Sequence, residues 1–182
     1  VFGLPVFLYS AGWRFGEVGG FLAVWTIGYG AVQAGAPAFI RRSPDGLTRE
    51  VPEARLWALG LTGMTLALAF AVIWQESLPI DPVAVVVCGL LLFGVAFAVN
   101  SSLHSYLILA YAGSKKAAED VGFYYAANAS GRLMGTLLSG LLYQLGGLAA
   151  CIVGAAAMLA ICTAISFALP LQANPDLTPE GY

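Results

Sequence analysis

The sequence has very little charge. Only 10% of its 182 residues are charged and 59% are hydrophobic, with a mean hydropathy of +0.82, whereas a soluble domain carries about 25% charged residues. Runs of about 20 apolar residues, long enough to cross ~30 Å of hydrocarbon, recur along the whole chain. We therefore expect an all-α membrane protein.

Basic residues are scarce as well. The chain has eight Lys and Arg and a formal net charge of -2, and these residues are scattered between apolar runs. They offer nucleic acid no basic surface, so a nucleic-acid partner is excluded and membrane lipid is the expected surrounding. The chain opens at Val1 inside an apolar run with no recognisable signal peptide, and we interpret this start as a helix that has been cut through.

Cysteine is limited to Cys88, Cys151 and Cys162, all within apolar runs. An odd count without paired spacing suggests neither a disulfide framework nor a zinc site. Eleven residues of helix separate Cys151 from Cys162 by roughly 16 Å, too far to share one metal atom. We interpret the three as packing residues and expect neither a metal nor another cofactor.

The apolar runs predict five complete helices and one truncated helix. Their approximate ranges are 1–11 (truncated), 18–40, 56–75, 83–111, 123–144 and 147–169, followed by a flexible tail at 170–182. The run 83–111 would extend roughly 43 Å as one helix, so it must tilt, project from the membrane, or break near the polar patch NSSLHS at 100–105. The sequence leaves these alternatives open.

Loop charges predict the orientation. Four arginines lie in residues 41–55, and Lys115 and Lys116 follow the fourth run, whereas the loops at 76–82 and 145–147 have no basic residue. The positive-inside rule places the basic loops in the cytoplasm, and by parity the tail too. We expect a multi-pass protein of the cell inner (plasma) membrane with a cytoplasmic C-terminus.

Arg132 lies near the midpoint of the predicted helix 123–144. An arginine at that depth costs about 2.5 to 3.5 kcal/mol on insertion scales, so something must offset it. Tyr125, Asn128 and Thr136 share its helical face, which indicates a helix that lines something wet. No Asp or Glu occurs inside any span. We favour a functional cationic site, with structural pairing to a carboxylate or to helix carbonyls as the alternative.

A second stripe on the same helix consists of small residues: Ala127, Gly131, Gly135 and Ser139. Small residues at this spacing allow another helix to approach closely, so we interpret this stripe as a packing surface.

Two other spans carry polar faces. Thr26, Tyr29 and Gln33 fall at helical spacing on the second span. Asn100, His104 and Tyr111 do so on the fourth, with Ser101 and Ser105 beside them. Three polar stripes suggest a shared cavity, whereas the third and sixth spans are expected to face lipid. The alternatives are a hydrogen-bonded packing role for His104 and helix-bridging roles for Asn100 and Gln33.

Two stretches carry a family resemblance. VGGFLAVWTIGYGAVQ (18–33) and SSLHSYLILAYAGSKKAAEDVGFYYAANASGRLMGTLLSGLLYQ (101–144) resemble the C-terminal half of an ArsJ-type organoarsenical efflux permease of the major facilitator superfamily. The loop 41–55 departs from the superfamily's usual Gly-x-x-x-Asp-Arg spacing. The resemblance implies a six-helix C-terminal half, numbered 7 to 12, in which 7, 8, 10 and 11 line the cavity, and a missing N-terminal six-helix half.

The resemblance also implies a function. Such permeases carry out secondary active efflux of an anionic arseno-phosphoglycerate by alternating access, which gives arsenate resistance, and they are linked functionally to a glyceraldehyde-phosphate dehydrogenase that makes the substrate. Arg132 would then bind the oxyanion, and the remaining expected substrate-binding residues are Asn128, Tyr125, Tyr29, Gln33, Asn100 and His104. The alternatives are a carrier for another small organic anion or drug, and a non-transporting membrane subunit.

An intramembrane enzyme is a further alternative, because Ser101, Ser102 and Ser105 lie beside His104. A serine nucleophile, however, needs a base presented across a cavity, and the sequence has no GxSxG-like turn and no second histidine. We do not expect an enzyme.

Overall fold

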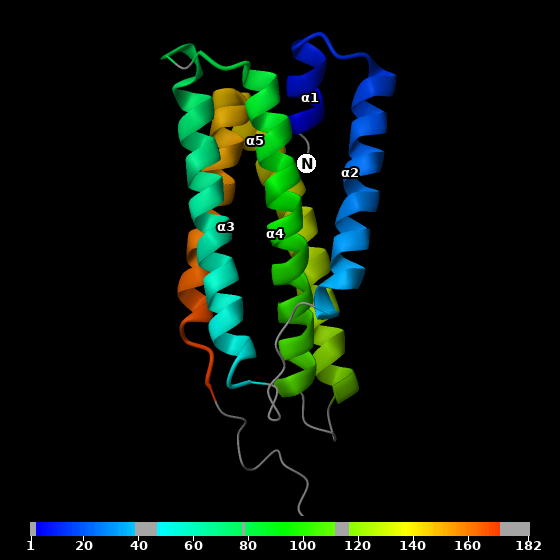
Figure 1. Ribbon diagram of the computed structural model, residues 1–182. Helices are drawn as coiled ribbons and strands as arrows, with labels where there is room; N and C mark the ends of the chain where they lie inside the picture. Colours follow the sequence, from blue (N-terminus) through cyan, green and yellow to red (C-terminus); the bar gives the residue numbers. More distant parts are fainter. Residues whose placement is uncertain (1–2, 39–46, 78, 112–116, 172–182) are drawn as a thin grey trace, which may run out of the picture.

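The computed structural model describes residues 3–38, 47–77, 79–111 and 117–171, and these residues contain helices and turns but no strand. The helices stand side by side in one bundle (Figure 1). They are α1 (Gly3–Ser10), α2 (Phe15–Gly35), α3 (Glu50–Ile73), α4 (Pro82–Tyr111) and α5 (Ala117–Ser166), with short 3-10 turns at Ala36–Ala38 and Gln75–Ser77.

Two glycines divide α5 into two arms. Gly146 and Gly147 have non-helical backbone angles, and Gly147, at φ 62° and ψ -152°, adopts a conformation that is essentially restricted to glycine. The first arm (117–145) and the second arm (148–166) run antiparallel, so that the Cys151 thiol reaches the carbonyl oxygen of Ser139 at 3.3 Å. The two predicted helices are therefore separate helices joined by a turn of two residues.

Helix starts differ from the expected ones in a consistent way. α3 begins at Glu50 instead of near 56, and α5 begins at Ala117 instead of near 123. Both first turns carry two acidic residues, which the positive end of the helix dipole favours. Polar residues that looked like loop therefore belong to the first turns of these helices.

α4 is continuous through the polar patch at 100–105. It runs from Pro82 to Tyr111, 30 residues or about 45 Å, so the expected alternative of a break does not occur. The Ser105 hydroxyl donates to the carbonyl oxygen of Ser101 at 2.9 Å, and Nδ1 of His104 lies 2.9 Å from the carbonyl oxygen of Asn100. These polar side chains bind within their own helix and do not interrupt it.

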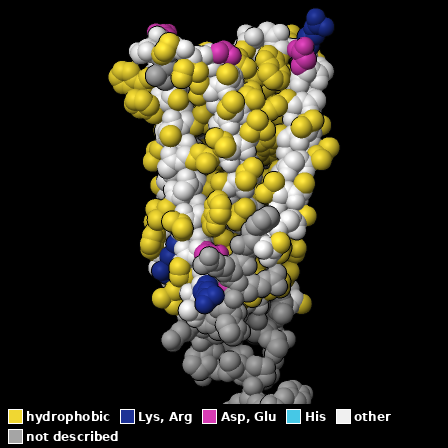
Figure 2. Space-filling view, viewed as in Figure 1, with side chains coloured by type: hydrophobic (Ala, Val, Ile, Leu, Met, Phe, Trp, Pro, Cys, Tyr) yellow, Lys and Arg dark blue, Asp and Glu magenta, His cyan; other side chains and the backbone are white. Residues whose placement is uncertain are grey.

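Within the described ranges, four helices are long and apolar enough to cross a membrane: Phe15–Ala38, Glu50–Ile73, Pro82–Tyr111 and Ala118–Ser166, the last containing both arms. The face in Figure 2 carries a broad hydrophobic surface, with charged side chains gathered toward its two ends. This distribution is the one that a membrane-spanning bundle requires, and it is consistent with the expected membrane protein.

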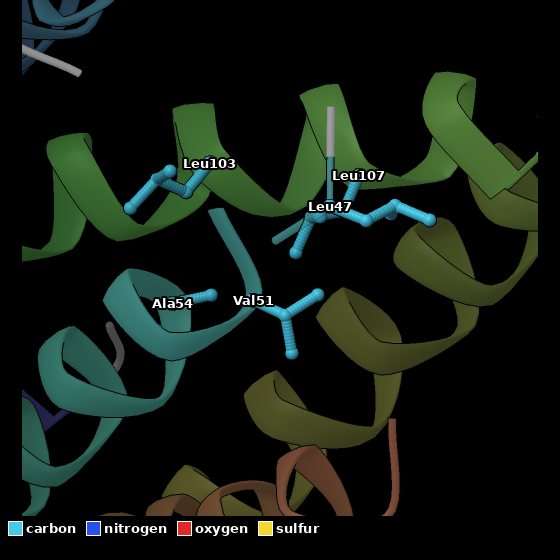
Figure 3. Packing of buried hydrophobic residues seen from close by; sticks show 5 residues of the cluster. All are labelled: Leu47, Val51, Ala54, Leu103 and Leu107. Atoms are coloured by element: carbon cyan, nitrogen blue, oxygen red, sulfur yellow. The ribbon is translucent and has the colours of Figure 1, made fainter. Parts of the chain in front are cut away.

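A cluster of buried hydrophobic residues joins the start of α3 to α4. Its buried core consists of Leu47, Val51, Ala54, Leu103 and Leu107 (Figure 3). α3 also contacts the second arm of α5, where the hydroxyls of Thr62 and Thr163 lie 2.9 Å apart. Its opposite face leaves Leu56 and Phe70 exposed, so α3 has one packed side and one exposed apolar side.

Arg55 closes the same end of the bundle. From α3 its guanidinium donates to the carbonyl oxygens of Ser166, Phe167 and Leu169, at 3.1, 3.1 and 2.8 Å, and it also lies over the Phe167 ring. Carbonyls at a helix C-terminus have no partner in their own helix. Arg55 thus provides the cap that the second arm lacks.

We expect Arg55→Met to lower the free energy of unfolding by about 1 to 3 kcal/mol, because hydrogen bonds to a charged group are lost while the aliphatic packing is kept. Thermal unfolding in detergent measures the change. Arg49→Met is the matched control, since Arg49 is exposed at the same end. Equal effects of the two substitutions would contradict the capping role.

Trp25 joins α2 to α4. Its indole Nε1 donates to the carbonyl oxygen of Leu90 at 2.9 Å, and its ring lies over Gly94, where a Cβ atom would come within 2.9 Å of Nε1. The glycine is what lets the indole approach the α4 backbone.

Gly94→Ala should therefore weaken the contact between α2 and α4 and destabilise the protein by about 1 to 3 kcal/mol, since the indole has to move from Leu90. Gly28→Ala, on α2 with no atom within 4 Å of the added Cβ, serves as control. There the better helix propensity of alanine should leave stability unchanged or raised. Trp25 fluorescence and thermal unfolding report both results.

Candidate functional site

Arg132 lies on the first arm of α5 with an exposed side chain. Its guanidinium forms no hydrogen bond or ion pair with any residue that the structure describes. None of residues 118–145 of this arm is buried. The arm therefore stands at the edge of the bundle, and its guanidinium is open to an external partner.

The predicted companions of Arg132 lie on the same exposed stripe. Tyr125 is 66% exposed, and Asn128 and Thr136 are exposed as well. The Thr136 hydroxyl donates to the carbonyl oxygen of Arg132 at 2.9 Å and so stays within the helix. One side of the first arm thus presents an exposed cation, amide and phenol, and the Tyr125 ring lies beside the Tyr124 ring at a centroid distance of 5.5 Å.

The small-residue stripe on this arm is open too. A Cβ atom added at Gly131 or Gly135 would meet no atom within 4 Å. The helix contact predicted for these glycines is therefore not made by any described residue. At the far end of the arm, by contrast, the backbone N–H of Gly3 in α1 lies 3.4 Å from the Ser139 hydroxyl.

Tyr29 is part of an aromatic column between α2 and α4. Its ring stacks on Trp25 at a centroid distance of 5.9 Å and on Phe97 at 5.8 Å, and Phe97 stacks on Phe93 at 5.6 Å. Such stacks stabilise a helix pair. The structure thus places Tyr29, half-buried, in the packing between α2 and α4.

A polar bridge connects α2, α4 and the first arm. The Gln33 amide donates to the Ser101 hydroxyl at 3.4 Å, and the Ser105 hydroxyl lies 3.2 Å from the Tyr124 hydroxyl. Sequence reasoning placed Gln33 in the site but selected Tyr125. It is the neighbouring Tyr124 that faces α4. Ser101 and Ser105 are four residues apart and so share one face of α4, which is the face that Tyr124 meets.

Asn100 and His104 occupy another side of α4. Asn100 is 9% exposed, and its Oδ1 atom has no hydrogen-bond partner in the described part of the chain. His104 lines a groove with residues of the second arm, from Met158 to Leu169. Successive residues differ by about 100° around a helix, so each of these side chains is turned from the serine that follows it, although His104, three residues after Ser101, lies only about 60° from Ser101. The predicted residues of α2 and α4 thus make different contacts: Gln33 with Ser101, Tyr29 with Phe97, and His104 with the groove.

Metal chemistry has no site among the described ranges, where no group of three His, Cys, Asp or Glu side chains converges. Cys151 lies between the two arms of α5, whereas Cys88 and Cys162 are exposed and unpaired. Anion binding through Arg132 is the chemistry that this arrangement offers most directly.

Comparison with known proteins finds no matching family model, no matching curated protein and no matching solved structure. Family and function consequently depend on the residues and their arrangement, and the resemblance to an efflux permease remains a prediction.

The bond between Ser105 and Tyr124 can be measured by a double-mutant cycle. We expect Ser105→Ala and Tyr124→Phe each to destabilise the protein, with a coupling of about 0.5 to 1 kcal/mol, typical of hydrogen bonds between membrane helices. Tyr125→Phe should show no coupling to Ser105→Ala. Additive effects of Ser105→Ala and Tyr124→Phe would contradict the bridge.

Proposed function

We propose that this chain is the C-terminal half of a secondary transporter that exports a small organic anion. The observation that carries the proposal is Arg132, which stands exposed and without a partner in the described chain, halfway along a helix of membrane-spanning length. The first arm begins at residue 117 and ends near residue 145, so the arginine lies about 20 Å from either end.

That depth is the reason for a functional interpretation. A guanidinium about 20 Å from both helix ends cannot easily reach either interface, and its cost of about 2.5 to 3.5 kcal/mol needs water or an anion to offset it. Tyr125, Asn128 and Thr136 extend the polar stripe along the same side of the helix. Arginine presents a planar fork of donors that matches a carboxylate, phosphate or arsenate in bidentate fashion.

We infer that a second bundle of helices packs opposite this stripe. α2 has Val18 as its single buried residue, and the first arm has none among residues 118–145. We infer that these two helices face the N-terminal six-helix half that the resemblance implies. The two halves would rock about the site, which would open alternately to each side of the membrane.

The substrate class comes from the resemblance. It favours an arseno-phosphoglycerate, which combines several oxyanion groups in one small molecule, and the cytoplasmic orientation expected from the basic loops makes the direction efflux. A carrier of another small organic anion is the second candidate, because the fork of Arg132 suits any oxyanion of this size.

Transport by the full-length protein in inverted membrane vesicles tests the role of Arg132. The substrate is generated from arsenate by glyceraldehyde-phosphate dehydrogenase. We expect Arg132→Gln to reduce uptake about 30-fold or more, the effect of losing about 2 kcal/mol from a buried charge pair. Arg132→Lys, which keeps the charge but not the fork, should retain part of the activity.

Arg49→Gln is the matched control, because Arg49 is an exposed arginine at the end of the bundle, and it should transport normally. Unchanged uptake by Arg132→Gln would overturn the site. Wild-type uptake of 3-phosphoglycerate in the absence of arsenate, with no preference for the arsenical, would keep the anion carrier and reject the arsenical class.

A further inference from the structure

A groove separates α4 from the second arm of α5. Its volume is about 320 Å³, and it is lined by His104, Met158, Ile161, Cys162, Ile165, Ser166 and Leu169. Met158, Ile161 and Ile165 are 52%, 57% and 64% exposed, so the groove opens on the outer surface of the bundle. It belongs to neither the stripe of Arg132 nor the polar bridge at Gln33.

The walls of the groove are mainly apolar, because its polar residues form hydrogen bonds within their own helices. The Ser166 hydroxyl donates to the carbonyl oxygen of Cys162 in its own helix at 2.9 Å. Nδ1 of His104 is engaged with the carbonyl oxygen of Asn100. Thioether, thiol and branched aliphatic groups make up the rest of the surface, which therefore suits a hydrocarbon ligand.

The groove has the length of one membrane leaflet. From Met158 to Ser166 the helix rises about 12 Å, and the turn after it carries the wall on to Leu169. Half of the ~30 Å hydrocarbon core is about 15 Å. Arg55 binds the carbonyl oxygen of Leu169, so one end of the groove lies at the charged end of the bundle and the other near its middle.

The groove is open along its length, because Met158, Ile161 and Ile165, which line it, are each more than half exposed. A single alkyl chain fits, because its width is set by carbon–carbon contacts of about 4 Å.

We propose that this groove binds one acyl chain of a membrane phospholipid, taken from the leaflet at the Arg55 end of the bundle. The chain lies along the second arm from Leu169 to Met158 and packs against the edge of the His104 ring. The site is independent of the transported substrate, so it stands or falls separately from the proposed transport function.

Native mass spectrometry of the purified full-length protein tests the site. Protein in detergent is titrated with a phosphatidylglycerol that carries two monounsaturated chains, and the bound lipids are counted. Cys162→Trp fills the groove and should weaken the tightest lipid about tenfold, equivalent to losing contact with about two methylenes. Cys162→Ala leaves the groove open and should bind as the wild type does.

Val153→Trp is the matched control, because Val153 is exposed on the same arm and does not line the groove. It should leave the tightest lipid unaffected. Circular dichroism and gel filtration establish that both tryptophan variants are folded. Equal lipid affinity of the Cys162→Trp and Val153→Trp variants overturns the proposal, and so does a loss of binding in Cys162→Ala as large as that in Cys162→Trp.

Discussion

The constraint on which this structure depends is that hydrocarbon offers no hydrogen bonds to the backbone. A segment that crosses the membrane therefore has to pair its own backbone N–H and C=O groups in hydrogen bonds, and a single segment does so by forming a helix. The same constraint acts on the polar side chains. The hydroxyls of Thr26, Thr62, Thr65, Ser105, Thr136 and Ser166 all donate to a carbonyl four residues earlier in their own helix.

Once backbone and hydroxyl groups are satisfied locally, helices associate mainly where their surfaces approach closely. Glycine permits that approach at Gly94 under Trp25 and at Gly154 under Leu142. These two contacts join α2 to α4 and the first arm of α5 to the second, and Gly89 under Leu68 does the same between α4 and α3. α2 and the first arm remain open, and the open side carries Arg132. The first arm thus combines an exposed apolar surface, with Leu133 and Leu137 64% and 65% exposed, and the polar stripe of Arg132.

Apolar run length predicted the helices that are long and apolar enough to cross a membrane, because length and apolar character are properties of local composition. The ends of those segments were less predictable. At Glu50 and at Glu119 and Asp120, charged residues looked like loop, yet a charged residue in a first turn is favoured by the helix dipole. The stripe of Arg132 was also predictable, since helical periodicity alone puts Tyr125, Asn128 and Thr136 on its side.

The sequence by itself determined that the chain is helical, that its segments match a membrane, and that one helix carries a polar stripe around an arginine. Only the tertiary structure decided which polar residues meet. It joined Gln33 to Ser101, brought Tyr124 rather than Tyr125 to Ser105, and turned His104 toward an apolar groove. The physical reason is that periodicity gives the direction of a side chain relative to its own helix axis, whereas the neighbour that it meets depends on how each helix is rotated against the others.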